Sequence, residues 1–103
     1  MSPGTIGILV RDDKYFDYLK SFCSAAFDKG YKVQVFFSGK GVLLTQYSDF
    51  GTLINWVTPY VCEVSYRSHN LGGKELPGVG FKQFVTQARN AEMLDECDRY
   101  LVF

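Results

Sequence analysis

Apolar and polar positions along the chain predict strands and helices in regular succession. The run TIGILV at 5–10 is apolar and rich in β-branched residues, which is typical of a strand buried on both faces of a parallel sheet. From Asp12 to Gly30 apolar residues recur at helical spacing. They predict a helix whose apolar stripe is Tyr15, Phe16, Leu19, Phe22, Cys23, Ala26 and Phe27. Asp12 or Asp13 is expected to cap this helix and Gly30 to end it.

The rest of the chain continues the same alternation. KVQVFF at 32–37 predicts a second strand, and SGKG turns the chain after it. A short helix is expected at 42–47, a helix within 48–60 that is limited by Pro59, a strand at 60–64 and a helical stretch at 65–70. After these we expect a turn-rich stretch at 71–80, a short strand at 81–85, a helix at 87–97 capped by Thr86, and a last strand at 99–103.

Strands that alternate with helices predict an open α/β sheet with parallel pairing and helices on both faces. Sheets of this class bind ligands and perform chemistry at the carboxyl ends of their strands. The 103 residues suit one domain, 1–103, and contain no internal repeat or linker.

The composition makes some classes of function unexpected for this chain. Lys+Arg and Asp+Glu balance at 11 each, so a mainly electrostatic nucleic-acid binder is not expected. The start of the chain does not resemble a signal peptide, and no apolar run approaches the length of a membrane span. A cytoplasmic protein without a membrane partner is therefore expected. Aromatic residues make up 17% of the chain, and this share suggests subunit contacts.

Three cysteines carry the candidate chemistry. Cys23, Cys62 and Cys97 are widely spaced, with no C-x-x-C pair, and the chain has a single histidine. No zinc-ligand set is apparent, so we expect no metal site and free thiols. Cys23 lies in the apolar stripe of the first helix and is expected to be core. Cys97 is expected to be structural.

Cys62 lies near the carboxyl end of the third predicted strand, just before a predicted helical stretch. A thiol at this position would face the amino end of that helix, which favours a thiolate. The cations Arg67 and His69 follow closely and would also favour it, whereas the adjacent Glu63 would oppose it. Two interpretations stay open: Cys62 is a reactive thiol, or it is a buried residue packed like alanine.

The loop Ser38, Gly39, Lys40 and Gly41 follows the second strand at the same predicted sheet edge as Cys62. Its backbone N–H groups could bind a phosphate or sulfate, although the loop has neither the long glycine spacing nor the Lys-Ser/Thr pair of a Walker A motif. A simple turn is the alternative interpretation.

Four stretches occur in an order that is similar to one known family. They are TIGILVR, KVQVFFSGKGV, YVCEVSYRSHNL and DECDRYLVF. The chain resembles the DsrE/DsrF/TusD-type sulfur-relay family, also called DsrE-like proteins, over nearly its whole length. The residues that match the family's second-strand and last-strand motifs are Phe36, Phe37, Gly41, Val42, Cys97, Asp98 and Arg99.

The resemblance implies a flavodoxin-like three-layer α/β/α sandwich with a mostly parallel sheet of five strands. It implies homomeric trimers or hexamers, or assembly with sister subunits. It also implies that Cys62 carries sulfur as a persulfide between a donor and an acceptor protein, without a cofactor, and that Arg67 and His69 stabilise the thiolate. Where the family often has a basic pair and then glycine, this chain has RSHN, and Asn70 is expected to adopt the left-handed conformation.

Three functions are therefore considered. The first is a sulfur carrier that acts through Cys62. The second is a non-catalytic oligomeric subunit of a sulfur-relay complex. The third is a small-molecule or nucleotide binder in which the loop SGKG holds a phosphate.

Overall fold

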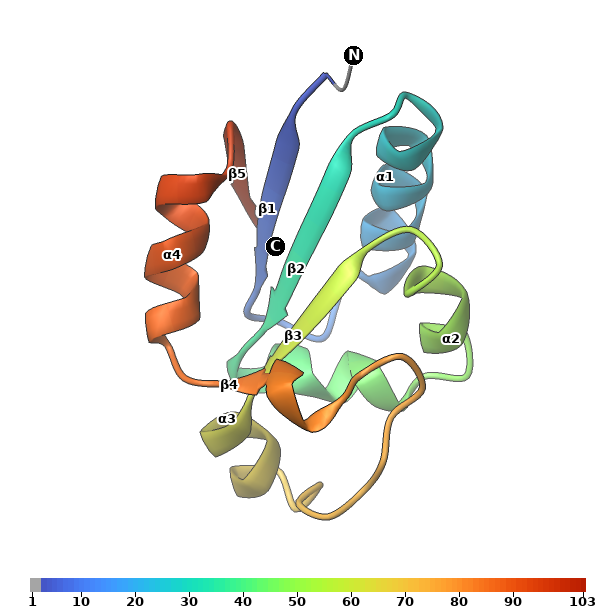
Figure 1. Cartoon of the computed structure of the whole chain (residues 1–103). Coiled ribbons are helices and arrows are strands. Elements are labelled where there is room, and N and C mark those ends of the chain that lie inside the picture. Colours follow the sequence, from blue (N-terminus) through green and yellow to red (C-terminus); the bar gives the residue numbers. More distant parts are fainter. Residues whose placement is uncertain (1–2) are drawn as a thin grey trace.

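Five strands form one open sheet at the centre of the molecule (Figure 1). The computed structural model describes residues 3–103. In chain order the strands are β1 (Thr5–Val10), β2 (Lys32–Phe37), β3 (Thr58–Cys62), β4 (Phe84–Val85) and β5 (Arg99–Val102). Every neighbouring pair is parallel. The predicted five-stranded α/β sheet is confirmed, and it is parallel throughout rather than mostly parallel.

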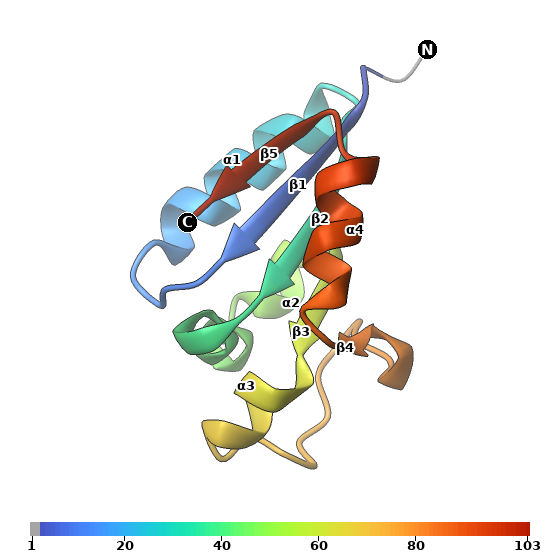
Figure 2. The same ribbon diagram turned by 90° about the vertical axis from the view of Figure 1, so that its left-hand side faces the viewer.

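Helices cover both faces of the sheet. Figures 1 and 2 show α1 (Phe16–Asp28) and α2 (Phe50–Leu53) on one side and α4 (Ala88–Glu96) on the other. α3 (Glu63–Ser68) and the 3-10 helices η1 (Gly39–Gln46) and η2 (Phe81–Gln83) lie at the end of the sheet where the strands finish. The layers are those of the expected flavodoxin-like α/β/α sandwich.

The strand order across the sheet is β4-β3-β2-β1-β5. The first four strands lie side by side in chain order, which differs from the order 2-1-3-4-5 of flavodoxin itself. α4 then carries the chain across the sheet from the β4 edge to the β5 edge (Figure 2). As a result, the start of α4 lies beside the ends of β3 and β4.

Two clusters of buried side chains hold the layers together. The larger lies under α1 and α2, and it contains strand residues such as Ile8 and Val35 together with Leu19 of α1. The smaller lies under α4 and contains Phe36, Cys62 and Met93. Neighbouring residues of a strand point to opposite faces, so Val61 enters the first cluster and Cys62 the second.

The first helix is shorter than the sequence predicts. It begins at Phe16 rather than at the aspartates, because Asp12 Oδ1 accepts a hydrogen bond from the N–H of Asp13 at 2.8 Å and thus serves a local turn. Gly30 follows the helix end with a φ of +88°, so its predicted role as a stop is confirmed. Part of the predicted stripe is wrong, because Tyr15 and Phe27 are exposed.

The third strand lies two residues earlier than predicted, at Thr58–Cys62 instead of 60–64. It includes Pro59, which has no N–H to donate. The sheet tolerates it because β4 pairs only with Val61 and Cys62. On that side the Pro59 carbonyl accepts a hydrogen bond from Gln83 Nε2 at 2.7 Å. This earlier start brings the end of the strand to Cys62.

Other boundaries also differ from the prediction. The helix expected within 48–60 is the single turn α2, and the one expected at 42–47 belongs to η1, which begins at Gly39. SGKG is therefore the start of a 3-10 helix rather than a turn. The first half of the fourth predicted strand is η2, and α4 lies inside its predicted range.

Candidate functional site

Cys62 ends β3, and α3 begins at the next residue. Its backbone is still extended, with a φ of −67° and a ψ of 114°, and that of Glu63 is already helical. The side chain is 3% exposed and packs against Phe36 and Met93 beneath α4. The predicted position of Cys62, at the carboxyl end of a parallel strand and before a helix, is confirmed.

Polar groups surround the sulfur on the side away from this apolar cluster. Burial alone would raise the pKa of the Cys62 thiol. The hydroxyl and the N–H of Ser65, the Gln87 amide and the Val64 N–H lie near the sulfur and act in the opposite direction. Together they hold the pKa of the thiol below its usual range, so the arrangement favours the thiolate.

The loop after β2 supports these donors. The N–H of Gly39 donates to Ser65 Oγ at 2.9 Å, and Gln87 Nε2 donates to Ser38 Oγ at 2.8 Å. Gln87 Nε2 also donates to Cys62 Sγ at 3.4 Å. The site is therefore built by three segments that are far apart in the sequence: the end of β2, the start of α3 and the start of α4.

The same loop was predicted as a possible anion-binding site at Ser38, Gly39, Lys40 and Gly41. Three of its N–H groups are already used inside the protein. That of Ser38 donates to the Val10 carbonyl, that of Gly39 to Ser65, and that of Gly41 to the Ser38 carbonyl. Lys40 is exposed. The loop lies next to Cys62, as expected, and its N–H groups serve the neighbouring elements.

The cations predicted to assist Cys62 have other surroundings. Arg67 is exposed and forms an ion pair with Glu63 at 2.5 Å, one helical turn away. Glu63, the carboxylate expected to oppose the thiolate, is thereby paired with a cation. His69 follows the last residue of α3, so it lies roughly 10 Å along the axis from Cys62. The stabilising roles of Arg67 and His69 stay predictions.

Asn70 ends this segment in the left-handed conformation, with a φ of +62°. This confirms the prediction that Asn70 adopts the left-handed conformation.

The other two cysteines lie in different environments. Cys23 lies on the buried face of α1 and is fully buried, and burial raises the pKa of its thiol to about 12. Cys97 is half-buried, and burial, followed by the nearby Glu96 carboxylate, raises the pKa of its thiol. Of the three thiols, the pKa is lowered for Cys62 alone.

Arg89 fixes the start of α4 against the sheet. Its guanidinium lies 4.5 Å from the ring centre of Tyr60 and donates to Gln34 Oε1 at 2.8 Å. It also forms ion pairs with Glu92 and Glu96, both at 3.1 Å. These contacts hold the backbone of Gln87, two residues earlier, close to Cys62.

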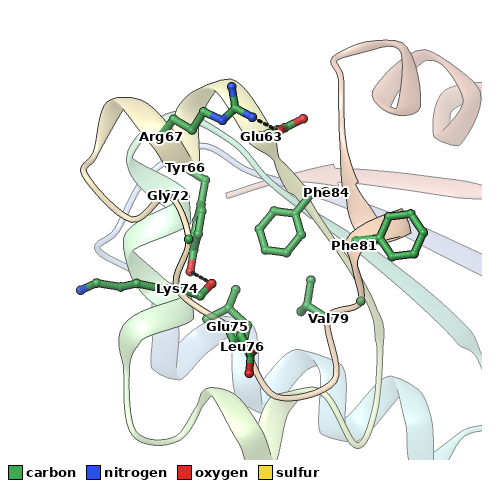
Figure 3. A pocket seen from close by; sticks show the side chains of 12 residues that line it. Glu63, Tyr66, Arg67, Gly72, Lys74, Glu75, Leu76, Val79, Phe81 and Phe84 are labelled. Atoms are coloured by element: carbon green, nitrogen blue, oxygen red, sulfur yellow. Dashed lines mark hydrogen bonds and ion pairs between the residues drawn. The ribbon is translucent and has the colours of Figure 1, made fainter.

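A pocket of about 520 Å³ lies beside α3 (Figure 3). Tyr66 and Phe84 form its apolar walls, and Glu63 and Arg67 lie at its rim. It is on the other face of the sheet from Cys62, because Phe84 pairs with Val61 and the next residue of β4 pairs with Cys62. The pocket therefore does not open onto the sulfur.

Among residues 3–103 there is no group of three or more His, Cys, Asp and Glu side chains that could hold a metal ion. Within the same range no helix is long and apolar enough to cross a membrane. Comparisons of the chain with protein-family models, with curated proteins and with solved structures find no match. The DsrE-like resemblance therefore stays a prediction from the motifs in the sequence.

Sequence reasoning missed Ser65 and Gln87. Ser65 had a detectable signal, because Cys62 and Ser65 have the i, i+3 spacing at which a capping residue and the first helical turn interact. Gln87 had none, because its contact with Cys62 depends on where α4 crosses the sheet.

Replacing Ser65 by alanine is expected to raise the pKa of the Cys62 thiol, because it removes a hydroxyl that lowers this pKa by favouring the thiolate. The rate of Cys62 alkylation by iodoacetamide at neutral pH should fall about tenfold, the loss expected for one hydrogen bond to a charged group. Alkylation rates measured over a pH series by peptide mass spectrometry test this.

Ser68→Ala is the matched control for this substitution. Ser68 lies in the same helix, and its hydroxyl donates to the Ser65 carbonyl rather than to the sulfur. The pH midpoint of alkylation should be unchanged in Ser68→Ala and in Ser65→Thr, which keeps the hydroxyl. A midpoint in Ser65→Ala equal to that of the wild type would contradict the assigned role.

Proposed function

We propose that the protein carries sulfane sulfur as a persulfide on Cys62, taking it from a donor protein and passing it to an acceptor protein. The observation that supports this most is the group of hydrogen-bond donors around the Cys62 sulfur, with Gln87 Nε2 at 3.4 Å, which lowers the pKa of that thiol despite its burial. A reactive thiol needs such an environment, and a cysteine that only fills space does not. The motif order shared with the sulfur-relay family supports the same role.

The transfer step conserves atoms and electron pairs. The Cys62 thiolate attacks the outer sulfur of a donor persulfide, R–S–SH. A bond forms between Cys62 Sγ and that sulfur, the S–S bond of the donor breaks, and the donor leaves as the thiolate R–S⁻. Cys62 becomes Cys–S–SH, and the proton remains on the transferred sulfur. The acceptor removes the outer sulfur by the same type of attack, so no external oxidant or reductant is required.

Hydrogen-bond donors can serve both steps. The Ser65 hydroxyl and the Gln87 amide contact the thiolate before attack. They stabilise Cys62 again as the leaving thiolate when the acceptor takes the sulfur. Such a carrier would work in a reducing compartment such as the cytoplasm, where thiols stay free. Specificity would come from the docking of donor and acceptor proteins, in a trimer, a hexamer or an assembly with sister subunits.

Sulfur loading tests the proposal directly. The protein is incubated with inorganic polysulfide and analysed by mass spectrometry of the intact chain and of its peptides. A gain of sulfur on the peptide that contains Cys62 is expected. No gain, or a gain located on Cys23 or Cys97 instead, would overturn the proposal.

A non-catalytic subunit is the second candidate, and the 3% exposure of Cys62 favours it. In that function Cys62 is a packing residue, and exposed aromatic side chains such as Tyr15 and Tyr18 contribute to assembly. The two candidates differ in the behaviour of the thiol. Rapid alkylation of Cys62 at neutral pH supports the carrier, and an inert thiol supports the subunit.

A further inference from the structure

The proposed carrier function does not explain how a partner protein reaches the Cys62 sulfur. The side chain is 3% exposed, yet the sulfur must meet a donor and then an acceptor. Phe36 and Met93, both fully buried, close the side toward α4 and the sheet. The pocket of Figure 3 lies on the opposite face of β3 and β4, so it provides no entry.

The polar groups near the sulfur belong to Val64, Ser65 and Gln87. The Val64 group is a backbone N–H inside the α3 segment. The Ser65 hydroxyl is held by the Gly39 N–H at 2.9 Å. Gln87 differs from both, because it is an exposed residue whose side chain reaches back over the sulfur from the start of α4.

We propose that the Gln87 carboxamide is a gate over the Cys62 sulfur. In the closed position its Nε2 donates to Ser38 Oγ at 2.8 Å and to Cys62 Sγ at 3.4 Å, bridging the end of β2 to the end of β3. In the open position both bonds are broken and the sulfur is accessible to the donor or acceptor. The inference rests on the proposed carrier function and assigns a regulatory residue to the same site.

The side chain can move without the helix that carries it. The position of α4 is fixed by Met93, which is fully buried, and by Arg89, which lies over the Tyr60 ring. Gln87 precedes the helix, and its amide is held by the two hydrogen bonds to Ser38 and Cys62. Rotation about side-chain bonds is therefore sufficient to open the site, and such rotations are fast at exposed positions.

The product also requires this movement. A persulfide extends the side chain by one S–S bond of about 2 Å. The closed amide lies 3.4 Å from Sγ, so the outer sulfur has no room on that side until the amide leaves. The gate therefore opens for loading and stays displaced while Cys62 carries sulfur.

Alkylation of Cys62 by iodoacetamide over a pH series separates the two effects of Gln87. The midpoint of the profile reports how easily the thiol ionises, and the plateau at high pH reports how accessible the thiolate is. In Gln87→Ala the plateau rate constant should rise by about tenfold or more, because two hydrogen bonds, one of them to the thiolate, no longer close the site. The midpoint should rise as well, because one donor to the thiolate is lost.

Two further variants make the result decisive. Ser38→Ala removes the bond that anchors the Gln87 amide and leaves its contact with Cys62, so a smaller rise of the plateau is expected. If Gln87→Ala does not fold, Ser38→Ala tests the gate in its place. Asn55→Ala deletes a carboxamide at an exposed position before β3, at the opposite end of that strand, and should leave the profile unchanged. A plateau that stays equal or falls in both Gln87→Ala and Ser38→Ala, or that rises equally in Asn55→Ala, would overturn the gate.

Loading the same samples with inorganic polysulfide tests the carrier function independently of the gate. If the wild type gains no sulfur on Cys62 while the plateau of Gln87→Ala rises, the carrier function fails and a gated thiol remains. If the wild type gains sulfur and the plateau does not change in the variants, the gate fails and the carrier function remains.

Discussion

Replacing Cys62 by serine is expected to abolish the gain of sulfur from polysulfide while leaving the fold intact. A serine hydroxyl does not ionise at neutral pH, so it cannot attack a sulfane sulfur. Serine is nevertheless among the best residues to precede a helix, and its oxygen can accept from the N–H groups of the first helical turn, where Val64 and Ser65 lie near the sulfur. The free energy of unfolding should therefore change by about 1 kcal/mol or less. Mass spectrometry and urea unfolding measure the two quantities.

Cys97→Ser is the matched control. Cys97 is half-buried, and the pKa of its thiol is raised by burial and by Glu96, so it should not compete for sulfur. The variant is expected to load as much sulfur as the wild type. Sulfur that is retained by Cys62→Ser but lost in Cys97→Ser would move the carrier role to Cys97.

Replacing Gly41 by alanine is expected to destabilise the protein by about 3 kcal/mol, at the upper end of the range for overpacking. An added Cβ would lie 2.2 Å from the Val10 carbonyl oxygen and 2.8 Å from its carbon. Both are backbone atoms of β1, which pairs with a strand on each side, so neither can move aside as a flexible side chain would. The loss is a large part of the 5–15 kcal/mol by which a typical domain is stable. Urea unfolding of the variant measures it.

Gly41→Ala should also change the reactivity of Cys62. The N–H of Gly41 donates to the Ser38 carbonyl, and this loop supports Ser65 and Gln87. If the loop shifts, the donors to Cys62 shift with it, and alkylation of the thiol at neutral pH should slow.

Gly51→Ala is the control for the effect of an added methyl group. Gly51 lies in α2, and an added Cβ there meets no atom within 4 Å. In a helix the change from glycine to alanine is favourable, so the stability should be equal or slightly higher. If the free energy of unfolding of Gly41→Ala equals that of the wild type, the loop can shift without loss of stability and the prediction is wrong.

Arg67 shows that proximity along the sequence does not by itself fix the direction of a side chain. The sequence places this cation five residues after Cys62, and proximity along the chain predicts that it assists the thiol. In the structure α3 turns its side chain to the rim of the pocket, together with Glu63 and Tyr66, which lie on the same helical face. The donors nearest the sulfur are Ser65, which lies three residues after Cys62, and Gln87, which lies 25 residues after it.

The first helix shows a related limit for boundaries. Spacing predicted the helix itself and most of its buried face, because an amphipathic stripe is a property of consecutive residues. It did not predict the start, because Asp12 forms a hydrogen bond with Asp13 rather than with the helix. Competing local hydrogen bonds of this kind differ little in energy, so the pattern alone does not choose between them.

The sequence by itself determined the alternation of strands and helices, the parallel α/β class and the position of Cys62 at a strand end, because these depend on apolar spacing within short segments. The tertiary structure decided the strand order, the face on which the sulfur lies and the partners that surround it. Gln87 meets Ser38 and Cys62 because α4 crosses the sheet from β4 to β5. Contacts between distant segments depend on packing, and no local pattern in the chain encodes them.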